Sequence, residues 1–169
     1  GKNDFILQRA AIGYDHPFSR DVSARIQYDG AANTILQAYA EVRNLQSFLD
    51  VKIGRMQTIH SETMDKVWDY RALAPAVLDR AGFTNEFDMG LAFTGRLNSA
   101  GSMYMKAAVY NGTGTLPEND KMKKGAIAFG NWLDRSSVLE VYADYENYPA
   151  HHNALNAALF YGMNSAKFS

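Results

Sequence analysis

The sequence predicts an all-β protein whose antiparallel strands form a transmembrane β-barrel. Apolar and polar residues alternate over long segments, so that each strand has one apolar face and one polar face. Several of these segments are about ten residues long, close to the 9–11 tilted residues that cross a bilayer. The connections between them alternate between short and long, which is typical of outer-membrane barrels with short periplasmic turns and long external loops.

The segment 86–112 shows the pattern most clearly and predicts two long strands joined by a tight turn. Every second residue from Phe87 to Phe93 is apolar, and so is every second residue from Met103 to Val109. The residues between them form a second, more polar face. Strands of this length and alternation predict a sheet with apolar material on one side and water or polar groups on the other.

The other predicted strands cover residues 5–15, 21–29, 35–43, 49–57, 123–133, 137–146 and 154–163. Together with the central pair this makes an odd number of strands. A closed antiparallel barrel in bacteria normally needs an even number, since no edge may be left unpaired. We therefore expect residues 1–169 to be a single, incomplete barrel domain, roughly the N-terminal half of a larger one.

The segment 58–85 interrupts the strand pattern and contains the one helix that the sequence predicts, Ser61 to Arg80. Pro75 should kink or divide this helix, because proline lacks the backbone donor that a helix interior needs. Elsewhere the longest apolar run, Ala157 to Tyr161, is far too short for a membrane-spanning helix.

Composition and motifs argue against several functions. The chain has no cysteine, which excludes thiolate metal sites and cysteine nucleophiles, and its net charge of -1 provides no field for nucleic acid. It has no hydrolase, zinc-protease or phosphate-loop motif. We expect His60, His151 and His152 to be solvated loop residues, because a metal site needs converging ligands. The predictions are therefore no enzyme, no metal and no cofactor.

Five segments, in order, resemble the outer-membrane porins of the phosphate-selective porin O and P type. They are 22–29 (VSARIQYD), 38–43 (AYAEVR), 51–57 (VKIGRMQ), 88–95 (DMGLAFTG, after Arg71 or Arg80) and 106–112 (KAAVYNG). The chain departs from the family after the Gly-Arg strand, where Thr58-Ile59-His60 replaces the usual Pro-Phe.

The resemblance implies a homotrimeric channel in the bacterial outer membrane, with about 16 strands per complete barrel. Such a channel passes small polar solutes or ions by passive diffusion, and phosphate or other anions are candidate solutes. The resemblance also implies that the loop 58–85 folds inward and narrows the pore. Its candidate constriction charges are Glu62, Asp65, Lys66, Asp69, Arg71, Asp79 and Arg80.

If the apolar strand faces contact lipid, the opposite faces line the pore. The predicted pore-lining residues are Arg9, Arg25, Arg43, Lys52, Arg96, Lys106, Glu41, Asp88, Glu140 and Asp144. Over the whole polar face the two signs are nearly balanced, and a ring of one sign is what selects ions strongly. An alternative reading is that these charges form cross-strand pairs that hold the wall together.

Aromatic residues near strand ends predict interfacial belts. The candidates are Tyr14, Phe18, Tyr28, Phe48, Phe87, Tyr110, Trp132, Tyr145 and Tyr148. The same aromatics could instead pack in the core of a soluble all-β domain. A third possibility is a plugged outer-membrane barrel that does not conduct and acts through its external loops.

Overall fold

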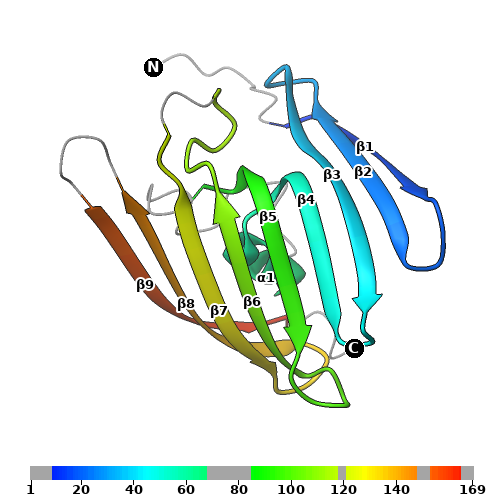
Figure 1. Ribbon diagram of the computed structural model, residues 1–169, viewed down its shortest axis with the longest axis vertical. Coiled ribbons are helices and arrows are strands. Elements are labelled where there is room, and N and C mark those ends of the chain that lie inside the picture. Colours follow the sequence, from blue (N-terminus) through cyan, green and yellow to red (C-terminus); the bar gives the residue numbers. More distant parts are fainter. Residues whose placement is uncertain (1–8, 68–84, 118–120, 148–152, 165–169) are drawn as a thin grey trace, which may run out of the picture.

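The computed structural model describes residues 9–67, 85–117, 121–147 and 153–164 (Figure 1). Within these ranges, nine strands form one antiparallel sheet in which every strand pairs with its neighbours in the chain. The strands are β1 (Ala11–Pro17), β2 (Val22–Asp29), β3 (Thr34–Leu45), β4 (Leu49–Gln57), β5 (Phe87–Arg96), β6 (Met103–Tyr110), β7 (Lys124–Trp132), β8 (Ser137–Asn147) and β9 (Asn153–Met163). The all-β antiparallel class and the nine strands are confirmed, but β1 and β9 do not pair with each other and the sheet is open.

Most strand boundaries lie within a few residues of the prediction. Strand β1 begins at Ala11, and residues 5–8 of its predicted range lie outside the described residues. Strand β3 continues to Leu45, two residues beyond its predicted end. The longer β3 is possible because Asn44, Gln46 and Ser47 all have positive φ angles, which closes the following turn within a few residues.

One glycine is required by the close approach of two strands. Gly54 of β4 has a φ of 126°, a conformation that residues with a side chain rarely adopt. A Cβ atom there would collide with the carbonyl oxygen of Ala38 on β3. The Gly-Arg pair that the sequence shows at this point is therefore a structural feature of the β3–β4 contact.

The two faces of the sheet differ in chemistry, as the alternation predicts. The outer face carries large apolar side chains that nothing in the described chain covers; Ile12 and Leu155 are each 73% exposed. Further members of this face are Tyr14, Ile26, Ile53, Met89, Phe93, Val109, Ile127, Phe129, Val141, Leu159 and Tyr161. The inner face carries the charged and small residues.

A single described helix, α1 (Ile59–Val67), packs on the inner face against β6, β7, β8 and β9 (Figure 1). It begins two residues before the predicted Ser61, and the predicted continuation to Arg80 lies outside the described residues. Small residues make room for it, since Ala108, Ala126 and Ala128 lie in the buried cluster beneath Ile59. No helix in the described ranges has the length and apolar character needed to span a membrane.

The connections are unequal at the two ends of the sheet. The connections after β1, β3, β5 and β7 are short, whereas those after β4 (58–86) and β6 (111–123) are long. The connections after β2 (30–33) and β8 (148–152) are short as well and depart from the predicted alternation. Helix α1 therefore belongs to the longest connection, between β4 and β5, and reaches the inner face from the end that carries the longer connections.

Candidate functional site

Helix α1 presents two different sides to the inner face of the sheet. One side is buried against the wall and contributes His60 and Thr63, neither of which is exposed to solvent by more than 1%. The opposite side carries Glu62, Asp65 and Lys66, which face the open part of the inner face beside β2 to β4. The site consists of these two sides and the strand residues that they contact.

The buried side is held by a cluster that we name the buried anchor: His60, Thr63, Tyr104, Lys106 and Glu140. Its centre is the Glu140 carboxylate on β8, which is 0% exposed. Thr63 donates a hydrogen bond to Oε2 at 2.5 Å, and the Tyr104 hydroxyl donates to the same oxygen at 2.8 Å. The other oxygen, Oε1, lies 3.2 Å from Nδ1 of His60.

Lys106 of β6 completes the buried anchor and is 3% exposed. Its Nζ donates hydrogen bonds to the Ile59 carbonyl oxygen at 2.9 Å and to the Thr63 hydroxyl at 2.6 Å. The same Nζ lies 3.9 Å from Oε2 of Glu140. A charge this deeply buried needs a partner of opposite sign, and Glu140 provides it.

A glycine allows Tyr104 to reach Glu140 across an intervening strand. Tyr104 on β6 is paired with Gly130 on β7, which is paired in turn with Glu140 on β8. A Cβ atom at Gly130 would overlap the Tyr104 ring. The absence of a side chain there lets the ring lie flat across β7, with its hydroxyl at the carboxylate.

The open side of α1 borders two small cavities of about 250 and 190 Å³. Both are lined by Lys52, Glu62 and Lys66. Lys52 of β4 and Glu62 of α1 form an ion pair with a 3.0 Å contact. This pair connects the helix to the strand wall and borders both cavities. Gln57 of β4 adds a second link by donating a hydrogen bond to Asp65.

The charge of Glu62 is stabilised by the lysines around it. Burial by itself raises the pKa of this carboxyl, but the positive charges of Lys106, Lys52 and Lys66 outweigh burial and lower the pKa from 4.5 to about 2. Glu62 is therefore ionised over the whole physiological range, and its pairs with Lys52 and Lys66 persist there.

The predicted pore-lining residues all lie at the polar face but differ in exposure. Arg9, Arg25, Arg43, Lys52, Arg96 and Glu41 are partly or largely exposed. Asp88, Lys106, Glu140 and Asp144 are buried and make hydrogen bonds or ion pairs within the protein. The cross-strand pairs of the alternative reading occur as well, for example Lys52 with Glu41 and Arg96 with Asp50.

Of the predicted constriction charges, Glu62, Asp65 and Lys66 lie on α1; Glu62 and Lys66 border both cavities, and Asp65 borders the larger one. Asp69, Arg71, Asp79 and Arg80 lie outside the described residues.

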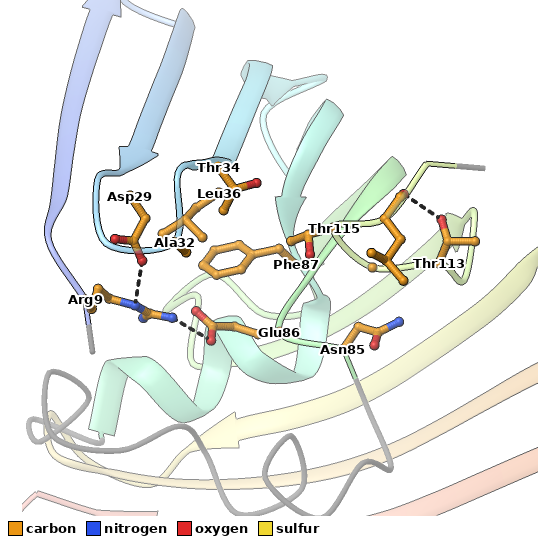
Figure 2. A pocket seen from close by; sticks show the side chains of 12 residues that line it. Arg9, Asp29, Ala32, Thr34, Leu36, Asn85, Glu86, Phe87, Thr113 and Thr115 are labelled. Atoms are coloured by element: carbon orange, nitrogen blue, oxygen red, sulfur yellow. Dashed lines mark hydrogen bonds and ion pairs between the residues drawn. The ribbon is translucent and has the colours of Figure 1, made fainter. Parts of the chain in front are cut away.

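A third and larger cavity of about 430 Å³ lies at the end of the sheet that carries the longer connections. Figure 2 shows Arg9 between Asp29 and Glu86, with ion-pair contacts of 3.8 and 3.0 Å, while Phe87 lies close to Leu36. Arg9, Asp29 and Glu86 pair with one another, so a ligand in this cavity would have to compete with these ion pairs.

Three residues have surroundings that the sequence did not predict. His60, expected to be a solvated loop residue, is fully buried, with its ring stacked on Tyr142 at 4.7 Å between centroids. Two predicted belt aromatics, Tyr110 and Phe87, are buried as well. The Tyr110 hydroxyl accepts a hydrogen bond from the Ile59 backbone and so fixes the start of α1. His151, His152 and Tyr148 lie outside the described residues.

Thr63 and Tyr104 are members of the buried anchor that sequence reasoning missed. The sequence contained one signal for this packing. The polar faces of β6 and β7 contain Ala108, Ala126 and Ala128, whose small side chains leave space above the sheet. Small residues at alternate positions on neighbouring strands indicate that another element packs on that face.

No protein-family model, curated protein or solved structure matches this chain. Over the described residues, no group of three or more histidine, aspartate or glutamate side chains is placed to hold a metal ion. The function is therefore inferred from the sheet, the helix and the charges alone.

Proposed function

We propose that this chain forms part of the wall of an outer-membrane β-barrel channel in bacteria, through which small polar solutes or ions diffuse passively. The observation that carries the proposal is the division of the sheet into two faces. Large apolar side chains are exposed all along the outer face, from Ile12 on β1 to Leu155 on β9, and burying them in lipid removes their contact with water. The inner face is polar, as the wall of an aqueous channel is.

Helix α1 is the element that narrows the proposed channel. It lies on the inner face, and its open side carries Glu62, Asp65 and Lys66. A helix that packs on the inner face occupies part of the bore and places its charges in the path of a solute.

The charges at the open side favour weak ion selectivity. Lys52 contacts both Glu41 and Glu62, and Arg96 contacts Asp50. A ring of one sign would attract ions of the other, whereas paired charges of both signs largely cancel at a distance. We therefore favour a general channel over one that is specific for anions.

A closed wall requires further strands beside β1 and β9. Both edge strands run in the same direction, because each successive strand of the sheet is antiparallel to the last. Only an odd number of added strands keeps every pair antiparallel. A total of about 16 strands meets this requirement, and we extend the proposal to a homotrimer of such barrels embedded in outer-membrane lipid.

Planar lipid bilayers test the proposal directly. The full-length protein, purified in detergent, should produce stepwise increases in current. Exchange of the salt for one with a larger anion and exchange for one with a larger cation should lower the conductance to a similar extent. Absence of current from protein that is correctly inserted would contradict a channel. Extraction from membranes without detergent would contradict the membrane location.

One observation favours a second function, a plugged barrel that acts through its external loops. The inner face of β6 to β9 is covered by α1, and its charges are buried rather than hydrated. If the covering extends across the whole bore, the protein passes almost no current although it inserts into lipid. The same bilayer measurement therefore separates the two functions.

A further inference from the structure

We propose that Lys106 and Glu140 act as one charge-coupled unit that positions α1, so that neutralising either residue releases the helix and neutralising both retains it. The role of α1 as a constriction rests on the proposed function, whereas the coupling itself concerns only the position of the helix. Neither residue lies on α1, so both act on the constriction by positioning it.

Lys106 holds the first turns of α1. Its Nζ donates to the Ile59 carbonyl oxygen at 2.9 Å and to the Thr63 hydroxyl at 2.6 Å, two groups that lie one helical turn apart. Since Lys106 is 3% exposed, no more than a trace of water reaches it. The ammonium group can keep this position only while a carboxylate balances its charge.

Glu140 balances that charge and holds the helix a second time. Its Oε2 lies 3.9 Å from the Lys106 Nζ and accepts the hydrogen bond that Thr63 donates, while Oε1 contacts His60. Thr63 thus accepts from Lys106 and donates to Glu140, which places one helix hydroxyl between the two charges. Both charged groups depend on each other and on the same helix residue.

The consequence is a coupling between two substitutions. Removing one charge of a buried pair is strongly destabilising, because the remaining charge must return to water or stay uncompensated. Lys106 borders the 190 Å³ cavity beside Lys52 and Glu62, and a shift of its ammonium group into that cavity would take it away from its two hydrogen bonds to α1. Replacing both members with uncharged residues of similar size is often neutral, because the desolvation cost disappears together with the attraction.

The two single substitutions should release α1 to different extents. Lys106 also interacts with Glu62, whose pKa it helps to lower, so that Glu140→Gln leaves Lys106 with one acidic neighbour. Lys106→Met leaves Glu140 with its contacts to Thr63, Tyr104 and His60 but without a lysine. We expect the larger release of the helix from Lys106→Met, since no other lysine contacts Glu140 among the described residues.

Spin labels can measure the position of α1 without any reference to transport. Residues 1–169 contain no cysteine, so Lys66→Cys on α1 and Ser99→Cys in the β5–β6 turn would be the only labelling sites within them. Both side chains are exposed. The distance distribution between the labels is recorded for the full-length protein in lipid, and again with Lys106→Met, Glu140→Gln and the double substitution.

We expect one narrow distance in the reference protein. Each single substitution should add a broad second population and lower the docked-to-released ratio about tenfold or more, while the double substitution should restore the narrow distance. An unchanged distance in both single variants would overturn the proposal. So would a double variant as broad as the worse single one, because the two contacts would then act independently.

Lys124→Met is the matched control. Lys124 on β7 is also a buried lysine, paired on β8 with Asp144 at 3.3 Å and with Glu146 at 3.7 Å, and neither of these partners lies on α1. This variant should weaken the wall without moving the helix label. A shift of the label as large as that from Lys106→Met would show a general loosening of the sheet and would count against a specific anchor.

Conductance of the same variants provides the second measurement. If the protein conducts, the single variants should show a larger or more variable conductance than the reference, and the double variant should return toward it. If the reference protein passes no current, the proposed function fails while the label distances still decide the coupling. Labels that respond as expected beside an unchanged conductance would refute the constriction and leave the anchor intact.

Discussion

The two halves of the inner face, β1 to β4 and β5 to β9, carry the same kinds of residue in opposite environments. Arg25 on β2 and Asp15 on β1 form a 3.0 Å pair in which the side chains are 32% and 63% exposed. Lys106 on β6 and Glu140 on β8 are 3% and 0% exposed. Helix α1 packs on β6 to β9 and covers Lys106 and Glu140, whereas Arg25 and Asp15 remain exposed.

The comparison teaches that the polar face of a strand does not by itself specify a solvated surface. Under α1, Lys106 and Glu140 each take part in several hydrogen bonds, and alanine residues lie on the same face of the strands. In the open half, longer side chains pair across neighbouring strands and remain in contact with water. Removing a charged or hydrogen-bonding group should therefore lower the free energy of unfolding more in the covered half than in the open half. The reason is that desolvation strengthens electrostatic interactions and raises the cost of breaking them.

The largest effect is expected for Tyr104→Phe in the covered half. This substitution removes a hydrogen bond of 2.8 Å to the buried Glu140 carboxylate and leaves that group with one donor fewer. We expect a loss of about 1.5–3 kcal/mol in the free energy of unfolding, measured by urea titration of the tryptophan fluorescence. Tyr161→Phe on the outer face is the control, since the Tyr161 hydroxyl contacts only the Met163 sulfur in the described chain. Equal losses in both variants would show that the hydrogen bond in the buried anchor contributes no more to the free energy of unfolding than an exposed hydroxyl does.

A smaller loss is expected when the space beneath α1 is filled. Ala128→Leu adds three carbon atoms at a position that is 0% exposed and packed near Ile59. Overpacking of this kind costs about 1–3 kcal/mol and should also displace the helix label. Ala107→Leu is the matched control on the outer face of β6, where the side chain is partly exposed. A tolerated Ala128→Leu would mean that α1 is packed too loosely to define a constriction.

Glu62 lies at the border between the two halves, and its contribution to the free energy of unfolding should depend on pH. Its folded pKa of about 2 is below its ordinary value of 4.5, so its contribution is present above pH 4.5 and is lost as the pH falls toward 2. After an allowance for partial exposure, we expect Glu62→Gln to lower the free energy of unfolding by about 1–2 kcal/mol at pH 7 and by almost nothing at pH 2. A difference between the two proteins that stays constant over this range would contradict the pairing with the lysines.

The smallest effect is expected in the open half. Arg25→Gln breaks the exposed pair with Asp15 and should change the free energy of unfolding by less than about 1 kcal/mol. Because the pair is in contact with water, the effect should disappear in about 1 M salt. A salt-independent loss as large as that from Tyr104→Phe would erase the distinction between the two halves.

Alternation along the chain was sufficient to predict most of the sheet. The assignment of Tyr104 and Lys106 to one face and of Met103 and Met105 to the other is confirmed, because successive side chains of a strand point to opposite sides. The same rule placed Glu140 correctly. It could not predict the buried state of His60, since a histidine in a long connection acquires its surroundings only when that connection packs on the sheet.

The sequence by itself determined the strands, their order and the residues of each face, because these depend on a period of two residues and on short turns between neighbours. The tertiary structure decided which part of the polar face is covered. Contacts such as that between His60 and Glu140 join residues 80 positions apart, and no local period encodes them. The position of α1 depends on shape and on charge balance across four strands, and this is why the buried anchor becomes visible only in the folded chain.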